Sequence, residues 1–141
     1  MVKILVINGP NLNMLGVRDK SIYGETSYND LVKMIKEYAK EKNVKVKCVQ
    51  SNYEGKIIEY IHKSIGKFDA IIINAGAYTH YSYAIKDALN LVNIPKVEVH
   101  ISNIYEREEF RKVNVIKDEC DYSIVGQGIK GYLLAIDYLR K

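Results

Sequence analysis

Two short, unbroken apolar runs constrain the fold of this chain most strongly. They occupy residues 4–7 and 70–73, and each is followed at once by an asparagine. Runs of this length and composition are typical of strands that are buried on both faces of a parallel sheet. Amphipathic helical patterns separate them from further strand patterns, and this alternation predicts a parallel sheet with helices on both faces.

The alternation continues to the end of the chain. We expect strands over residues 4–8, 44–50, 68–74, 96–100 and 122–125, and helices over residues 27–42, 54–65, 82–92 and 129–140, with a helical turn at 107–112. Four isoleucines of the second helix recur at helical spacing and are expected to face inward: Ile57, Ile58, Ile61 and Ile65. The pattern predicts one three-layer α/β domain with a five-stranded parallel sheet over residues 1–141.

The chain needs neither a disulfide nor a metal to fold, because a domain of 141 residues buries roughly two-thirds of its unfolded surface. Cys48 and Cys120 have no metal-ligand spacing, and we expect them to be buried spectator thiols. The N-terminus lacks a signal segment, and no apolar run approaches membrane-spanning length. These features predict a cytoplasmic protein that binds neither a metal nor a membrane.

The charge pattern narrows the class of ligand. The formal net charge is +4 and the isoelectric point is about 8.9. Lysines and glutamates alternate over residues 33–42, as on a solvated helix face, and no basic block with interleaved aromatic residues occurs. We therefore expect no nucleic-acid partner and favour a small anionic ligand.

Polar side chains gather where the expected strands end. The first strand leads to Asn11, and the fourth ends at His100. The third strand ends at Asn74 and leads to His80. Ligands of open parallel sheets bind outside the carboxyl ends of the strands, so we expect these side chains to share one pocket.

The loop after the first strand carries groups that can donate hydrogen bonds or transfer protons. Arg18 and Tyr23 follow Asn11 there, and the loop has glycines at positions 9, 16 and 24. These glycines would let the loop turn sharply and move as a lid. Asn11, Arg18 and Tyr23 are therefore candidate functional residues.

The three histidines differ in their surroundings. His62 lies in a helical pattern beside inward isoleucines, where a structural role is expected. His80 and His100 follow neighbouring strands, which favours a functional role. Glu98 and His100 share one face of a strand, so the carboxylate is placed to orient the imidazole and raise its basicity. The alternative is a salt bridge near the sheet edge.

The glycine pattern at residues 126–131 fits a dinucleotide-binding fingerprint but cannot serve as one. The chain ends ten residues later, which leaves no room for the second strand and its acidic residue. These glycines are expected to let the last helix approach the sheet closely. The loop after the first strand is neither a phosphate cradle nor an acidic pocket, which disfavours a flavin, a phosphoacceptor site and magnesium.

Several motifs together resemble one enzyme family, type II 3-dehydroquinate dehydratase. They span nearly the whole chain, at residues 7–13, 15–18, 23–24, 50–52, 74–80, 98–103, 107–111 and 126–132. The resemblance implies a flavodoxin-like fold and a shikimate-pathway lyase that converts 3-dehydroquinate into 3-dehydroshikimate without cofactor or metal. It also implies an enolate intermediate.

The resemblance assigns the chemical roles. Tyr23 matches the base, and Arg18 is the candidate cation that favours its phenolate. Asn11 matches the residue that holds a water against the enolate, and His100 matches the general acid, with Glu98 behind it.

The resemblance also assigns contacts to the substrate and to other subunits. The implied substrate contacts are Asn74, His80, Arg111 and the backbone amides of Ile101 and Ser102. Asp87 matches a residue that reaches the site of a neighbouring subunit, and a dodecamer built from trimers is implied by analogy.

The chain departs from the family pattern in a few places. Val113 and Asn114 stand where many members carry a histidine–serine pair, Tyr81 replaces a commoner small residue, and residues 20–22 lie in a variable part of the lid. The sequence leaves open how the departure at 113–114 bears on substrate contacts at that edge. Three alternatives stay open: a binding or signalling module, a catalytically silent scaffold, and Schiff-base chemistry by a lysine.

Overall fold

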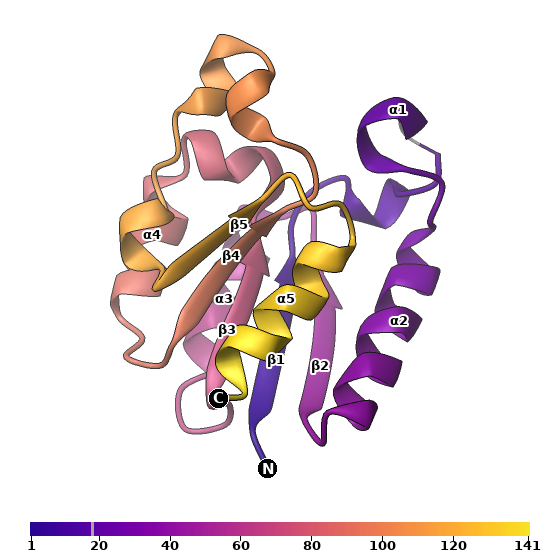
Figure 1. Cartoon of the computed structure of the whole chain (residues 1–141). Coiled ribbons are helices and arrows are strands. Elements are labelled where there is room, and N and C mark those ends of the chain that lie inside the picture. Colours follow the sequence, from indigo (N-terminus) through magenta and orange to yellow (C-terminus); the bar gives the residue numbers. More distant parts are fainter. Residues whose placement is uncertain (18) are drawn as a thin grey trace.

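The computed structural model describes residues 1–17 and 19–141. Five parallel strands form one sheet in the order β2-β1-β3-β4-β5 (Figure 1). Their bounds are β1 Lys3–Asn8, β2 Lys45–Gln50, β3 Ala70–Asn74, β4 Lys96–His100 and β5 Tyr122–Val125. The helices are α1 Lys20–Tyr23, α2 Tyr28–Glu41, α3 Glu54–Lys63, α4 Tyr83–Asn90 and α5 Lys130–Leu139. The three-layer α/β fold predicted from the alternation is therefore confirmed.

The strand β1 shows why the apolar runs specify a sheet covered on both faces. Its residues alternate between two cores, with Ile4 and Val6 packed against α2 and α5, and Leu5 and Ile7 packed against α3 and α4. Side chains of a strand point alternately to opposite faces, so an unbroken apolar run supplies both cores at once.

Serine hydroxyl groups cap the N-terminal ends of two helices. Ser27 Oγ accepts a hydrogen bond from the backbone N–H of Asp30 at 3.1 Å at the start of α2. Ser82 Oγ accepts one from Ile85 at 3.0 Å at the start of α4. Such caps satisfy N–H groups that lack partners within the helix.

Two local expectations differ from the structure. The helix α3 ends at Lys63 rather than at residue 65, so Ile65 lies beyond it and is 59% exposed instead of inward-facing. The loop after β1 contains the short helix α1 and a 3-10 turn at Leu12–Met14, which the sequence pattern did not indicate. Both departures are short segments in which helical periodicity has too few turns to be read.

The glycines at 9 and 131 allow close backbone approach. A Cβ atom at Gly9 would lie 2.6 Å from the carbonyl oxygen of Ala75, so the loops after β1 and β3 meet only because this position is glycine. A Cβ atom at Gly131 would lie 3.1 Å from Val99 and 3.3 Å from Ile124. Gly131 thus lets α5 lie close to the sheet, as predicted, whereas a Cβ atom at Gly126 would meet Asn103 and one at Gly128 would meet nothing within 4 Å.

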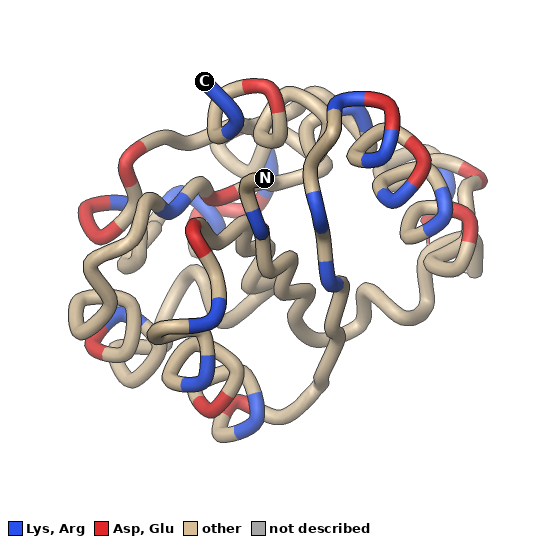
Figure 2. The backbone as a smooth tube through the Cα atoms, turned by 90° about the horizontal axis from the view of Figure 1, so that it is seen from below, with Lys and Arg blue, Asp and Glu red and all other residues tan. Residues whose placement is uncertain are grey.

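Charged residues are distributed over the surface rather than gathered into blocks. Blue and red positions alternate along the helices seen from below (Figure 2). Lys45 and Lys47 are exposed on the edge strand β2, where lysines disfavour pairing with another sheet. Within the described residues, no helix has the length and apolar character needed to cross a membrane.

Candidate active site

A pocket lies at the carboxyl ends of β1, β3 and β4. The segment after β4 and the helix α1 rise on either side of this end of the sheet (Figure 1). The predicted residues that line the pocket are Asn11, Tyr23, Asn74, His80, His100, Ile101, Ser102 and Arg111. The convergence of three strand ends on one pocket is thus confirmed.

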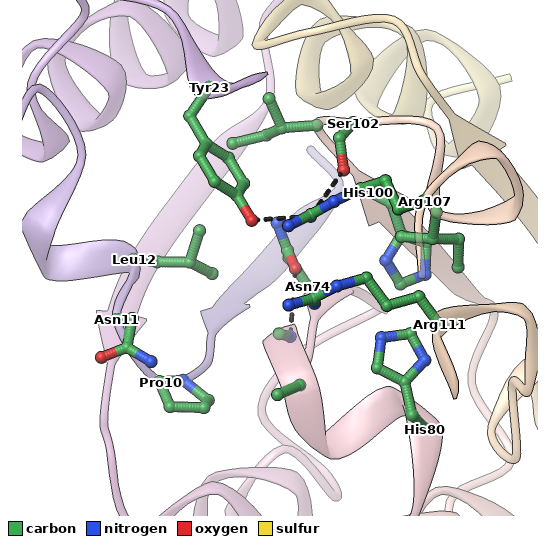
Figure 3. A pocket seen from close by; sticks show the side chains of 14 residues that line it. Pro10, Asn11, Leu12, Tyr23, Asn74, His80, His100, Ser102, Arg107 and Arg111 are labelled. Carbon is green, nitrogen blue, oxygen red and sulfur yellow. Dashed lines mark hydrogen bonds between the residues drawn. The ribbon is translucent and has the colours of Figure 1, made fainter. Parts of the chain in front are cut away.

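Tyr23 and Arg107 meet across the mouth of the pocket. The Nη1 atom of Arg107 donates a hydrogen bond of 2.7 Å to Tyr23 Oη and one of 3.2 Å to Ser102 Oγ (Figure 3). The guanidinium carbon also lies 5.4 Å from the centre of the Tyr23 ring. A cation that donates to a phenol oxygen stabilises negative charge on it.

Arg107 is the one residue of this pair that sequence reasoning did not single out. It lies between two 3-10 turns, Ile104–Glu106 and Glu109–Lys112, which bring Arg107 and Arg111 to the same pocket. The available signal was an arginine pair, four residues apart, following a strand that ends in histidine. The predicted cation for Tyr23, Arg18, lies outside the described residues.

His100 and Glu98 form a buried pair. The Nε2 atom of His100 lies 3.3 Å from Glu98 Oε2, and the Glu98 side chain is completely buried. β4 lies between β3 and the edge strand β5, so the alternative of a salt bridge near the sheet edge stays open. The predicted placement of both side chains on one face of the strand is confirmed.

Two uncharged hydrogen-bond donors also contact the Glu98 carboxylate. Its Oε1 atom accepts hydrogen bonds from Asn114 Nδ2 at 2.7 Å and from Ser123 Oγ at 2.5 Å. Burial raises the pKa of Glu98, but the contact with His100 and these two donors outweigh burial and hold it below its ordinary value. Glu98 is therefore ionised at neutral pH and faces the imidazole with a full negative charge.

His80 is held neutral with one nitrogen available to the pocket. Its Nδ1 atom lies 2.8 Å from the carbonyl oxygen of Val113, an acceptor, so Nδ1 carries the proton. Burial lowers the pKa of His80 despite this carbonyl, and the charges of Arg111, His100 and Arg107 add to the effect. The unprotonated Nε2 can then accept a hydrogen bond from a ligand hydroxyl.

A buried chain of hydrogen bonds orients Asn74. Tyr132 Oη donates to Asn8 Oδ1 at 2.6 Å and accepts from Asn74 Nδ2 at 3.0 Å. The N–H of Gly76 donates to Asn74 Oδ1 at 3.2 Å, which fixes the orientation of the amide. Tyr132 comes from α5, so the last helix supports the site through its hydroxyl.

Asn11 adopts a left-handed conformation with φ of 69°. Its backbone N–H donates to Asn52 Oδ1 at 3.0 Å, and Gln50 Nε2 donates to the same oxygen at 3.1 Å. The segment after β2 thus fixes the backbone of the loop that carries Asn11. Asp87 is exposed on α4 and does not line the pocket, so its predicted role toward another subunit stays a prediction.

The pocket carries positive charge. Both Arg107 and Arg111 extend into it, and no aspartate or glutamate lines it within the described part of the chain (Figure 3). Glu108 accepts a hydrogen bond of 3.0 Å from Arg111 Nε outside the pocket, which leaves the Nη atoms turned toward it. Among residues 1–17 and 19–141, no cluster of histidine, cysteine, aspartate or glutamate could hold a metal ion. The arrangement suits an anionic ligand and proton transfer between Tyr23, His100 and that ligand.

Comparison with known proteins finds one family along nearly the whole chain. The family model described as Dehydroquinase class II matches residues 2–140. The 3-dehydroquinate dehydratase of Thermotoga maritima is 57% identical over 99% of this chain and 96% of its own. That of Caldicellulosiruptor saccharolyticus is 58% identical over 100% of this chain and 98% of its own.

Solved structures show the same fold. The crystal structure of type II dehydroquinase from Butyrivibrio crossotus superimposes with a TM-score of 0.98 at 59% identity, covering 99% of this chain and 98% of that one. The enzyme from Propionibacterium acnes gives a TM-score of 0.96 at 42% identity, covering 99% and 96%. With the matched family model spanning nearly all its residues, this chain belongs to the class II dehydroquinase family.

Proposed function

We propose that this chain dehydrates 3-dehydroquinate to 3-dehydroshikimate through an enolate, with Tyr23 as the base and His100 as the general acid. The observation that carries the proposal is the pairing of Tyr23 with Arg107 at a pocket that also holds His100, backed by Glu98. Membership of the dehydroquinase family places the reaction in the shikimate pathway.

The first step is removal of a proton from the carbon alpha to the ketone. A tyrosine has an ordinary pKa of about 10, so it acts as a base at neutral pH only where a cation stabilises its phenolate. The 2.7 Å hydrogen bond from Arg107 supplies that cation. Arg18 is a second cation by resemblance, and its role stays a prediction.

The second step stabilises the enolate oxygen. Asn11 lines the pocket, and its backbone is fixed by Asn52 in the left-handed conformation. We assign to Asn11 the task of holding a water against the developing negative charge. A donor held in place before the reaction stabilises such charge more than a mobile one.

The third step is loss of the hydroxyl group, which needs a proton. His100 is placed to give it, because the ionised Glu98 carboxylate faces its other side at 3.3 Å. The carboxylate behind the ring holds the imidazole in position to give that proton. No metal or organic cofactor has a part in this sequence of steps.

The remaining lining residues are assigned to substrate binding. His80 Nε2 and the Asn74 amide are oriented to bond hydroxyl groups, and Arg111 adds positive charge for the substrate carboxylate. We assign the carboxylate itself to the backbone amides of Ile101 and Ser102.

We also propose assembly into a dodecamer built from trimers, in which Asp87 reaches a neighbouring site. Exposed apolar side chains on and after α4 support this, since Tyr83 is 65% and Leu91 is 64% exposed in the single chain. Sedimentation of the purified protein tests the assembly. The cytoplasmic location stays a prediction from the sequence.

The test of the reaction is an ultraviolet assay for the conjugated enone product, with EDTA-treated protein and 3-dehydroquinate. We expect turnover in the wild type, none in Tyr23→Phe, and wild-type rates in Tyr138→Phe, a matched loss of a hydroxyl on the outer part of α5. A folded wild type without turnover would point instead to a silent scaffold. Wild-type rates in Tyr23→Phe would remove tyrosine from the mechanism.

A further inference from the structure

We propose that Asn114 is a positioning residue for the acid step, because it holds the Glu98 carboxylate in the orientation that faces His100. This inference rests on the proposed role of His100 as general acid. Asn114 does not line the pocket, and it acts from behind the strand that carries both residues.

The orientation of the Asn114 amide is determined by its neighbours. Its Oδ1 atom accepts hydrogen bonds from the backbone N–H groups of Ile116 at 3.1 Å and Lys117 at 3.0 Å. An amide oxygen accepts and an amide nitrogen donates, so Nδ2 must be the atom that faces Glu98. The 2.7 Å contact with Glu98 Oε1 is therefore a donated hydrogen bond.

The two carboxylate oxygens of Glu98 have different neighbours. Asn114 and Ser123 both donate to Oε1, which leaves Oε2 turned toward His100 at 3.3 Å. Oε2 is buried and has no hydrogen-bond partner of its own. Loss of the Asn114 donor would free Oε1 to compete for the imidazole or to take a proton.

The charges around Glu98 come from few groups. The titratable groups near Glu98 include His100 and Cys120, and burial raises the pKa of the Cys120 thiol to about 12, so the thiol is neutral. Lys96, two residues before Glu98 on the same face of β4, is a buried cation that also acts on Cys120. Asn114 and Ser123 are the neutral donors. Within the described residues, the ionisation of Glu98 at mildly acidic pH thus depends on His100 and on these two hydrogen bonds.

The same short segment supports both histidines of the site. The carbonyl oxygen of Val113 holds His80 Nδ1 at 2.8 Å, and the next residue, Asn114, reaches His100 through Glu98. The sequence left open what the departure from the family pattern at these positions does. In the structure the two residues contact His80 and Glu98.

The decisive variant is Asn114→Asp. It keeps an oxygen for the two backbone N–H groups but replaces the donor to Glu98 with an acceptor, so two carboxylates must share a proton. We expect kcat to fall about 10- to 100-fold, as for other residues that orient a catalytic group, with a small change in KM. Glu98 would protonate at higher pH, so the acidic limb of the pH–kcat profile should move up by roughly one unit.

Matched variants separate this effect from damage to the fold. Asn90→Asp makes the same change at a surface amide that donates to Glu119 at 2.9 Å, and it should leave kcat and the pH profile unchanged. If Asn114→Asp does not fold, Asn114→Ala removes the donor without adding charge and should move the acidic limb in the same direction.

The outcomes are distinguishable. A folded Asn114→Asp or Asn114→Ala enzyme with wild-type kcat and an unmoved acidic limb would overturn the inference. The His100→Gln variant tests the underlying assignment separately. If His100→Gln loses turnover while the Asn114 variants are unaffected, only the positioning role fails. If His100→Gln keeps turnover, the acid assignment fails and the positioning role with it.

Discussion

Arg107 Nη1 donates a hydrogen bond of 2.7 Å to Tyr23 Oη, and the two residues are 84 positions apart in the sequence. Tyr23 is the last residue of α1, whereas Arg107 follows β4. The contact therefore joins α1 to the segment after β4, which carries Ser102. It places a cation on the phenol oxygen.

Replacing Arg107 should impair catalysis more than binding. Arg107→Lys keeps the charge but cannot present the planar fork that contacts both Tyr23 and Ser102. We expect kcat to fall roughly 10-fold in Arg107→Lys and about 100-fold in Arg107→Ala, the range for loss of a charged hydrogen bond. Steady-state kinetics measure this, with Arg140→Ala on α5 as the control; equal loss in that control would assign the effect to stability.

Removing the Tyr132 hydroxyl should weaken both substrate binding and the fold. The Tyr132→Phe variant leaves Asn8 and the Asn74 amide without their shared partner in a buried place. We expect a stability loss of about 1–3 kcal/mol and a rise in KM of about tenfold. Urea unfolding and steady-state kinetics test these effects, and an unchanged KM would mean that the Asn74 amide needs no orienting group.

The close packing of α5 predicts opposite effects for two glycine substitutions. In Gly131→Ala, the new methyl group would press on Val99 and Ile124, at a cost of about 1–3 kcal/mol. In Gly55→Ala, on α3, nothing lies within 4 Å of the new methyl group, so stability should rise by up to about 1 kcal/mol. Thermal unfolding of the two variants at the same protein concentration tests this. Similar melting temperatures would contradict the close approach of α5 to the sheet at Gly131.

Glu98 should make stability depend on acidic pH. Its pKa in the folded chain lies below the ordinary value of 4.5, so ionised Glu98 favours the folded state above about pH 4.5, and this stabilisation is lost as pH falls through the folded pKa. The Glu98→Gln variant should therefore lose less stability than the wild type between neutral and acidic pH. Denaturant titrations across this range measure it, and parallel losses would show that Glu98 does not drive the effect.

The regular elements were predictable because their patterns are local. Residues 96–100 and 122–125 form strands with the predicted bounds. The sharing of one pocket by Asn74, His80 and His100 followed from the parallel topology alone, since parallel strands end at one edge.

The parts that were not predicted depend on contacts between distant segments. The Tyr23–Arg107 hydrogen bond, the Tyr132–Asn74 bond and the Asn114–Glu98 bond join residues whose separation carries no periodic signal. Ile65 was misplaced because α3 ends at Lys63, before the apolar spacing does. These hydrogen bonds and this helix end depend on tertiary packing, which local sequence patterns do not reveal.

The most direct test separates proton abstraction from loss of the hydroxyl group. In deuterium oxide, the His100→Gln variant should still exchange the proton alpha to the ketone of 3-dehydroquinate faster than the spontaneous rate, but form little product, because Tyr23 is intact. Tyr23→Phe should show neither exchange above that rate nor dehydration. Nuclear magnetic resonance of the unreacted substrate reports the exchange. Rapid exchange by Tyr23→Phe would contradict the assignment of Tyr23 as the base.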